Sequence, residues 1–579
     1  MKRRTFLKTG AMAGAGLVLT GRHVYGQSPN LAKYVDPLFT AIPTLTPANM
    51  GSYDQYGITM VKGAWRFHSR LPVTPAPTLA YLPMPYLGGT IEAKRGREVR
   101  VTWANAIVGP HPLAAAIDTT VPGGYVFSET KPMDFDLRAV PHLHGGFIPA
   151  QYDGHPESWF TPSGGVGKRH HSYTYRYGNE QRACMLWYHD HAMGMTRLNA
   201  YAGLAALYFI RDQSDPGGFV DLVTPGVSLN LPKAPYEIPL VLQDKSFNPD
   251  GSLFYPTIGI TPTHPKWVPE FFGDVPVVNA VAYPYLNVEP RRYRFRMVNG
   301  SQARFYSLWI DNGLNPIPFW QIGNEAGFLR APVPLTKMLI APGERADFIV
   351  DFTGMAPGTL LTMKNNAKAP YPGGRGGQVS QIMQFRVTAL TGPPDTTALP
   401  GTLALPPIAA LTPGGVVRDI VLIEKMDPVL GVPLEVLLND KHFQATVTEA
   451  PTRTTTEVWQ FINITGDAHP MHMHLVHFQI LNRQPINAKA FTAAYMAGLN
   501  PQVANFLAGP AAPPAPGENG WKDTAIAMPG EVLRIVAKFD LPTVEPSLPM
   551  GGVSPQYVYH CHILEHEEND MMRPFEVVG

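Results

Sequence analysis

Near its end the chain reads His560-Cys561-His562-Ile563-Leu564-Glu565-His566. In a β-strand, successive side chains point to opposite faces. A strand through this stretch therefore carries the two imidazoles of His560 and His562 on one side and the Cys561 thiol on the other. The pattern predicts a strand with a different metal-binding chemistry on each face.

The thiol face has the residues of an electron-transfer site. His566 follows Cys561 by five residues, Met571 follows His566 by five, and His469 is available from an earlier cluster. Two histidines, one cysteine and a weak methionine ligand are the blue-copper set. Zinc favours four strong ligands, and iron–sulfur clusters need more cysteines than the two in this chain. The residues on the thiol face therefore predict a copper site.

Three further His-x-His pairs lie upstream of this stretch. They are His142-Leu143-His144, His189-Asp190-His191 and His472-Met473-His474. Neutral imidazoles suit copper, zinc, iron or nickel. Eight imidazoles are too many for one ion, and they divide naturally into two three-histidine coppers and one two-histidine copper with open positions. The segment His560-Cys561-His562 then connects two sites. The copper on the thiol face accepts one electron at a time, and the three coppers on the imidazole face form a site for oxygen.

The flanking sequence predicts an all-β chain. Apolar and polar residues alternate over 96–103, 292–298, 456–461 and 531–536, and 60 prolines and 54 glycines punctuate the 579 residues. We expect three β-sandwich domains, over residues 31–215, 216–390 and 417–579, with a Pro/Gly-rich linker at 391–416. The middle domain has one histidine, His264, and no cysteine, which predicts a spacer or wall without copper.

Overall composition excludes several classes of protein. The net charge is +1 with no concentration of either sign, which argues against nucleic acid as a partner. Two cysteines cannot form a disulfide framework. Downstream of the first 27 residues, no stretch is long and apolar enough to predict a membrane span.

The first 27 residues have the pattern of an export signal. Lys2, Arg3 and Arg4 precede Thr5-Phe6-Leu7-Lys8 and an apolar run from Gly10 to Leu19. This order resembles a twin-arginine signal, with Lys2 in place of the usual Ser or Thr. It predicts a periplasmic or extracellular protein.

The four histidine motifs resemble those of three-domain multicopper oxidases. Within that family the likeness is greatest to spore-coat-type laccases and bilirubin oxidases, on Gly520-Trp521-Lys522-Asp523-Thr524 and Glu568-Asn569-Asp570-Met571-Met572-Arg573-Pro574. The resemblance implies cupredoxin-like Greek key domains and four copper ions. It implies type 1 copper on His469, Cys561, His566 and Met571, type 2 copper on His142 and His472, and the type 3 pair on His144, His189, His191, His474, His560 and His562.

The same resemblance implies an activity. A laccase oxidises phenolic or other small aromatic reductants, bilirubin among them, and reduces dioxygen to water with four electrons. We expect a monomer. The alternatives are a metallo-oxidase of Cu(I), Fe(II) or Mn(II) and, remotely, a copper-free cupredoxin scaffold of the cell envelope.

Two carboxylates are candidates for proton delivery to dioxygen. Glu567 directly follows His566, and Asp153 lies nine residues beyond His144. Related laccases use carboxylates at both positions. The alternative is that Glu567 belongs to a solvated acidic run over 565–570 and that Asp153 only makes a turn with Gly154.

Four other residues are expected to have structural roles. The adjacent His170 and His171 face opposite ways and are predicted to lie in a loop. His477 is expected in the core or behind the metal ligands. Cys184 is expected to be a buried free thiol.

Overall fold

The computed structural model describes residues 28–72, 76–123, 136–376, 379–543 and 555–579. It also gives the backbone of two short strands, β1 (Val18–Thr20) and β2 (His23–Tyr25). The remainder of the predicted export signal over 1–27 lies outside the described residues. The described chain is built of strands, with the three short α-helices α2 (Thr196–Ala202), α3 (Ala488–Met496) and α4 (Leu564–Glu568) and a few single-turn 3-10 helices. The all-β prediction is confirmed.

The first domain is a sandwich of two sheets. One sheet contains β3 (Ala48–Asn49), β4 (Tyr53–Trp65), β5 (Ala76–Tyr81), β7 (Glu98–Asn105) and β9 (Thr174–Tyr177). The other has the order β6 (Ile91–Lys94), β11 (Ala205–Arg211), β10 (Cys184–Asp190) and β8 (Pro141–His144). On β7, Val99, Val101 and Trp103 are buried while their neighbours are more exposed, so the predicted alternation is confirmed.

The third domain repeats this arrangement. One sheet has the order β28 (Pro433–Leu438), β27 (Val417–Met426), β29 (Thr456–Asn463), β33 (Glu531–Lys538) and β31 (Phe478–Pro485). The other has the order β32 (Thr524–Ala527), β30 (His469–Met473), β34 (Gln556–Cys561) and β35 (Met572–Glu576). In each domain a parallel pair of strands mixes with antiparallel ones, β4 with β7 and β27 with β29, as crossovers between sheets require.

The middle domain contains the largest sheets. The first includes β12 (Glu237–Phe247), β18 (Arg292–Asn299), β24 (Arg345–Asp351), β21 (Phe319–Asn324) and β22 (Gly327–Leu335), with β13 (Leu253–Phe254), β15 (Val275–Val278) and β16 (Val281–Ala282) at its edge. The second includes β17 (Tyr285–Val288), β26 (Gln381–Val387), β25 (Leu360–Asn365), β19 (Tyr306–Asp311), β20 (Pro316–Ile317) and β23 (Met338–Ile340).

The alternation of apolar and polar residues over 292–298 does not leave one face of the strand in solvent. Every residue of β18 is buried, because its polar face lies against other charged groups. Arg294 is 2.9 Å from Asp215 and also pairs with Asp347. Apolar and polar residues do alternate along β18, but its polar residues form buried ion pairs instead of facing solvent.

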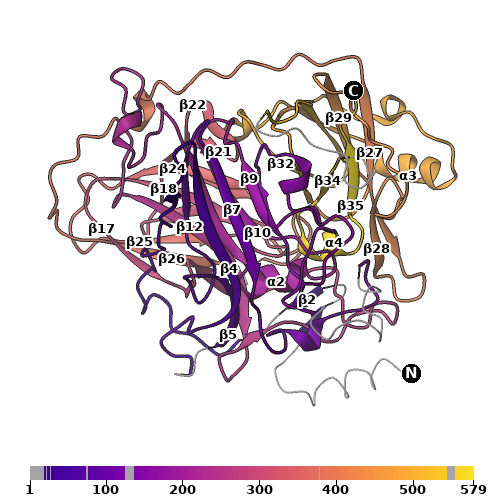
Figure 1. Cartoon of the computed structure of the whole chain (residues 1–579), viewed down its shortest axis with the longest axis horizontal. Coiled ribbons are helices and arrows are strands. Elements are labelled where there is room, and N and C mark those ends of the chain that lie inside the picture. The colour runs from indigo at the N-terminus through magenta and orange to yellow at the C-terminus, as the bar shows by residue number, and fades with distance from the viewer. Residues whose placement is uncertain are drawn as a thin grey trace.

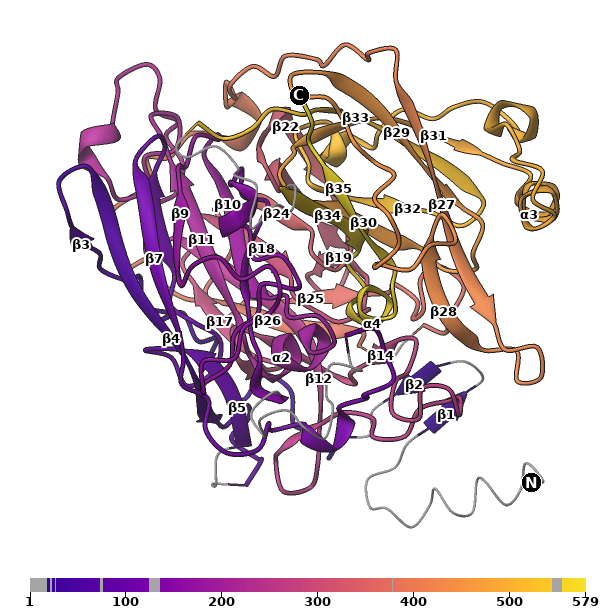
Figure 2. The same ribbon diagram turned by 45° about the vertical axis from the view of Figure 1, so that its right-hand side comes forward.

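Figures 1 and 2 show the two outer domains side by side, with strands of the middle domain next to both. The stretch 391–416 runs as an extended strap from the middle domain to β27 (Figure 1). Hydrogen bonds fix it at several points, among them Arg330 to the Ile408 carbonyl and Gln479 to the Ala409 carbonyl. The domain limits given above stay a prediction.

Candidate metal centres

The His-x-His pairs come from two pairs of neighbouring strands. In the first domain β8 pairs with β10, which sets His142 opposite His189. In the third domain β30 pairs with β34, which sets His472 opposite His560. The second histidines, His191, His474 and His562, lie just past the ends of their strands. The rings within each pair are still only 5.0–6.0 Å apart, so the two rings of a pair lie close together.

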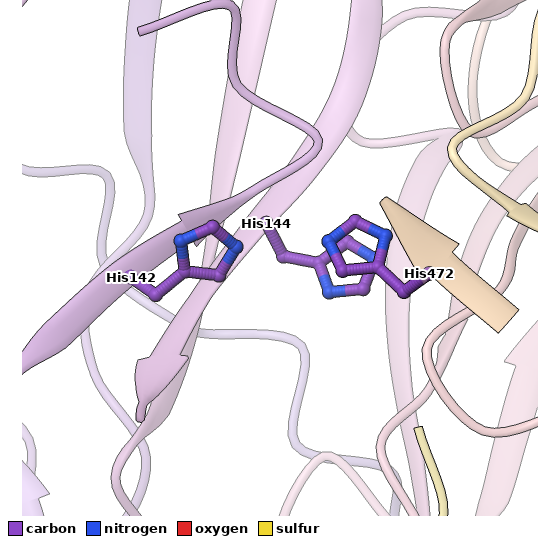
Figure 3. Close-up of side chains that lie close together, drawn as sticks. All are labelled: His142, His144 and His472. Atoms are coloured by element: carbon purple, nitrogen blue, oxygen red, sulfur yellow. The ribbon is translucent and has the colours of Figure 1, made fainter. Parts of the chain in front are cut away.

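The two strand pairs face each other and bring eight imidazoles together. Ligand atoms lie within 4.8 Å of one another in three groups. The groups are His142, His144 and His472; His144, His189 and His562; and His191, His474 and His560. His142 and His144 come from β8 and His472 comes from β30 (Figure 3). The rings of His144 and His472 stack at 3.7 Å, and those of His142 and His474 at 3.8 Å.

Hydrogen bonds occupy one nitrogen of most of these rings and leave the other without a partner. Nδ1 of His142, His472 and His189 bonds to the backbone carbonyls of Asp153, Asp523 and Asp190 at 2.5, 2.9 and 2.9 Å. Nε2 of the same three rings is buried and has no partner. Metal-binding histidines characteristically donate their other N–H to a carbonyl or carboxylate. The unpartnered nitrogens therefore fit a metal.

Burial keeps seven of these eight imidazoles neutral. It lowers the pKa of His142, His144, His191, His472, His474 and His562 well below the ordinary value, and that of His189 to about 3. The positive charge that each ring would add near the others lowers several of these pKa values further. A neutral ring keeps the lone pair that a metal requires.

The thiol site lies within the third domain. Cys561 Sγ is 3.5 Å from His469 Nδ1 and 3.7 Å from His566 Nδ1, and the two nitrogens are 3.2 Å apart. First-row metal ions bind nitrogen at about 2.0 Å and sulfur at about 2.3 Å, which in a trigonal site puts two nitrogens about 3.5 Å apart and a nitrogen and a sulfur about 3.7 Å apart. The two sulfur–nitrogen distances match this spacing, and the two nitrogens are slightly closer together. Met571 is buried, and its backbone bonds to both Cys561 and His566.

The surroundings of Cys561 favour a bound cation beside its sulfur. Burial raises the pKa of its thiol well above the ordinary value, and only the thiolate is a good metal ligand. The N–H of Ile563 donates to Sγ at 3.5 Å. Burial also lowers the pKa of His469 to about 3, and its Nε2 lies 2.7 Å from the Thr465 hydroxyl. A bound metal would supply the charge that a thiolate needs here.

Both predicted carboxylates are buried beside the imidazoles. Asp153 Oδ2 lies 2.6 Å from His474 Nδ1. Glu567 lies 3.4 Å from His191 Nδ1 and 3.2 Å from His560 Nδ1. Glu567 is 1% exposed, and every residue of α4 is buried, so the alternative of a solvated acidic run is wrong. Asp153 does precede a turn, since Gly154 has φ +77°.

The acidic run is buried because other domains supply its partners. Arg197 of α2 pairs with Glu568 at 3.0 Å, and Tyr255 donates to Glu565 at 2.6 Å.

Asp190 is a site residue that the sequence analysis missed. Its carboxylate accepts from the N–H of Val140 and Ala192, which fixes the turn that carries His191. Its place inside a His-x-His motif was the available signal.

The middle domain is a wall that touches the site. Within the described residues, none of its side chains joins the groups of metal-binding atoms. A Cβ on Gly343 would nevertheless lie 2.8 Å from the His562 ring, and Arg345 pairs with Asp523, whose carbonyl holds His472. No sequence motif identifies Gly343 or Arg345 as a site residue.

The four residues expected to be structural fit that expectation. His170 and His171 lie in a loop outside the metal-binding groups of the described chain. His477 donates from Nε2 to the Gly145 carbonyl at 2.9 Å, directly behind His144. Cys184 is a buried free thiol on β10.

Comparisons with known proteins agree with this geometry. Multicopper oxidase family models match residues 137–215 and 425–578. A laccase of Bacillus subtilis (strain 168) is 39% identical over 564 residues, which cover 94% of this chain and 99% of the relative. Multicopper oxidase LPR1 of Arabidopsis thaliana is 34% identical over 539 residues, which cover 90% of this chain and 88% of the relative.

Solved structures show the same fold. The crystal structure of a laccase from Pediococcus acidilactici Pa5930 superposes with a TM-score of 0.69 at 24% identity, covering 96% of each chain. The McoA multicopper oxidase 2F4 variant of Aquifex aeolicus superposes with a TM-score of 0.68 at 25% identity, covering 95% of this chain and 100% of that one. The expected cupredoxin-like fold is confirmed. With relatives of this identity along nearly the whole chain, the protein belongs to the multicopper oxidase family and is a laccase-like copper oxidoreductase with dioxygen as its electron acceptor.

Proposed function

We propose that the protein binds four copper ions and oxidises small aromatic reductants, phenols first among them. Type 1 copper binds His469, Cys561, His566 and Met571. Type 2 copper binds His142 and His472. The type 3 pair binds His144, His189 and His562 on one ion and His191, His474 and His560 on the other. The observation that carries this proposal is the set of buried imidazoles whose nitrogens converge in groups of three, with an unpartnered nitrogen on seven of the eight rings.

The chemistry of the copper ions, when bound, is one-electron oxidation of the reductant and four-electron reduction of dioxygen to water. The chain supplies the connection between the two sites. Cys561 points into the third domain, while His560 and His562 point toward the first. A side chain on each face of one strand gives a covalent path on the order of 10 Å.

Protons for water formation come from Glu567 and Asp153 in this proposal. Glu567 would deliver its proton from an Oε atom, and its two Oε atoms lie beside His191 and His560. Asp153 holds one at an Oδ atom beside His474. Both carboxylates are buried against histidines of the imidazole site, which supports a role in proton delivery there.

Steady-state kcat/KM tests the substrate class. Copper-loaded protein would be compared on a phenol, bilirubin, Cu(I), Fe(II) and Mn(II), with Cys561→Ser as the blank for type 1 chemistry. We expect the aromatic reductants to have the highest values. Higher values for a metal ion would replace this proposal with a metallo-oxidase.

We also propose export by the twin-arginine signal and a monomeric state. Replacement of Arg3 and Arg4 by lysine should retain the precursor in the cytoplasm, and light scattering should give the mass of one chain. No helix within the described residues is long and apolar enough to cross a membrane.

A further inference from the structure

One side chain of the middle domain, Arg345, contacts both outer domains. Arg345 begins β24 and is 2% exposed. Its Nη1 donates to Asp523 Oδ1 at 2.8 Å, and its Nη2 donates to Asp523 Oδ2. Its Nε donates to the Met185 carbonyl on β10 at 3.2 Å. The guanidinium therefore joins residues of all three domains.

Asp523, the partner of Arg345, in turn contacts two of the histidines. Its Oδ1 lies 3.2 Å from His144 Nε2, and its carbonyl accepts from His472 Nδ1 at 2.9 Å. The Thr524 hydroxyl donates to the same Oδ1 at 2.9 Å. A carboxylate oxygen next to Nε2 favours a proton on that nitrogen of His144, which leaves Nδ1 bare. Nδ1 of His144 and Nε2 of His472 are both buried and without a partner.

The pair is closely packed on the side of Gly145. Gly145 follows His144, and a Cβ there would lie 2.3 Å from Asp523 Oδ2 and 2.5 Å from Arg345 Nη2. Arg345 Nη1 also donates to the carbonyl of Gly343 at 3.0 Å, the residue that packs on His562.

We propose that Arg345 is a positioning residue for the imidazole site: it holds Asp523 in one place, so that the Asp523 carboxylate fixes the tautomer of His144 and the Asp523 backbone carbonyl fixes the orientation of His472. This inference rests on the ligand assignment proposed above. A planar guanidinium with two parallel bonds holds a carboxylate in one orientation, which a lysine cannot do. Partners of metal-binding histidines typically contribute about 10–100-fold to metal affinity.

The test compares Arg345→Gln with Arg304→Gln. Arg304 is a matched control in the same domain: it is 2% exposed, pairs with buried Asp244 at 2.7 Å and donates to the Gly273 carbonyl. The readouts are copper per chain, the type 2 EPR signal relative to the type 1 signal, and copper release to a chelator. The blue type 1 absorption reports the folded fraction in the same sample.

We expect Arg345→Gln to release copper from the imidazole site, type 2 copper through His472 and type 3 copper through His144, at about 10–100-fold lower chelator concentration while it keeps the blue absorption. Arg345→Lys should fall between this variant and the unmodified protein, and Arg304→Gln should match the unmodified protein. Equal type 2 retention in Arg345→Gln, or equal loss in Arg304→Gln, would overturn the proposal. Asp523→Asn keeps the side-chain volume and carries the same expectation if Arg345→Gln does not fold. A missing type 2 signal in the unmodified protein would count against the ligand assignment, and the Arg345 inference would fall with it.

Discussion

The two metal-binding regions are built in different ways. The thiol site takes all its predicted ligands from the third domain, between His469 and Met571, and three of these four lie between Cys561 and Met571. The imidazole site takes four histidines from the first domain and four from the third, and the middle domain closes it with Gly343 and Arg345. One site depends on local spacing within a domain, while the other depends on how three domains dock.

The largest expected effect separates the two regions completely. Cys561→Ser removes the only thiol of the third domain and leaves every His-x-His pair intact. We expect loss of the blue absorption and of turnover, with copper still present at the imidazole site. Absorption, EPR and metal analysis on one sample check this. A persistent blue band would show that another sulfur binds the metal.

Glu567→Gln should act on the imidazole region alone. It keeps the size of the side chain and removes the proton that the carboxyl can hold. General acid–base groups typically contribute about 10²–10⁴-fold, so reoxidation by dioxygen should slow by that order. Anaerobic bleaching of the type 1 copper should be unchanged. Stopped-flow absorption measures both rates, and slower bleaching with normal reoxidation would assign Glu567 to His566 and the thiol site instead.

Thr465→Val should act on the thiol region alone. It removes the hydroxyl that lies 2.7 Å from His469 Nε2 and keeps a similar shape. Loss of such a partner typically costs about 10–100-fold in metal affinity. Chelator titration should therefore show weaker type 1 copper binding and unchanged copper at the imidazole site. Equal weakening of both sites would mean that the hydroxyl stabilises the whole domain.

The smallest expected effect concerns Gly343 of the middle domain, which packs against the imidazole site. Gly343 has φ +82°, and a Cβ would meet the His562 ring; Gly354 of the same domain has φ +78° and open space around it. Alanine at either position costs about 1–2 kcal/mol for the backbone conformation. Only Gly343→Ala should also reduce type 3 copper, measured as copper per chain. Equal copper in the two variants would show that the loop yields without moving His562.

The comparison also explains what could be predicted from the sequence. The period of two identified the strands, and the His-x-His spacing identified every histidine that converges at the site. The burial of β18 and of the run 565–570 could not be read from local pattern, since the partners of these charges are distant in sequence: Asp215 for Arg294 and Arg197 for Glu568. Arg345 and Gly343 carry no motif, and only the docked domains give them a role.

The most direct test of the account is the number and position of the copper ions. Metal analysis of fully loaded protein, with anomalous diffraction at the copper edge, measures both. The account predicts four ions per chain: one at Cys561, and three among the eight imidazoles between the first and third domains. One, two or six ions, or an ion bound within residues 216–390, would contradict it.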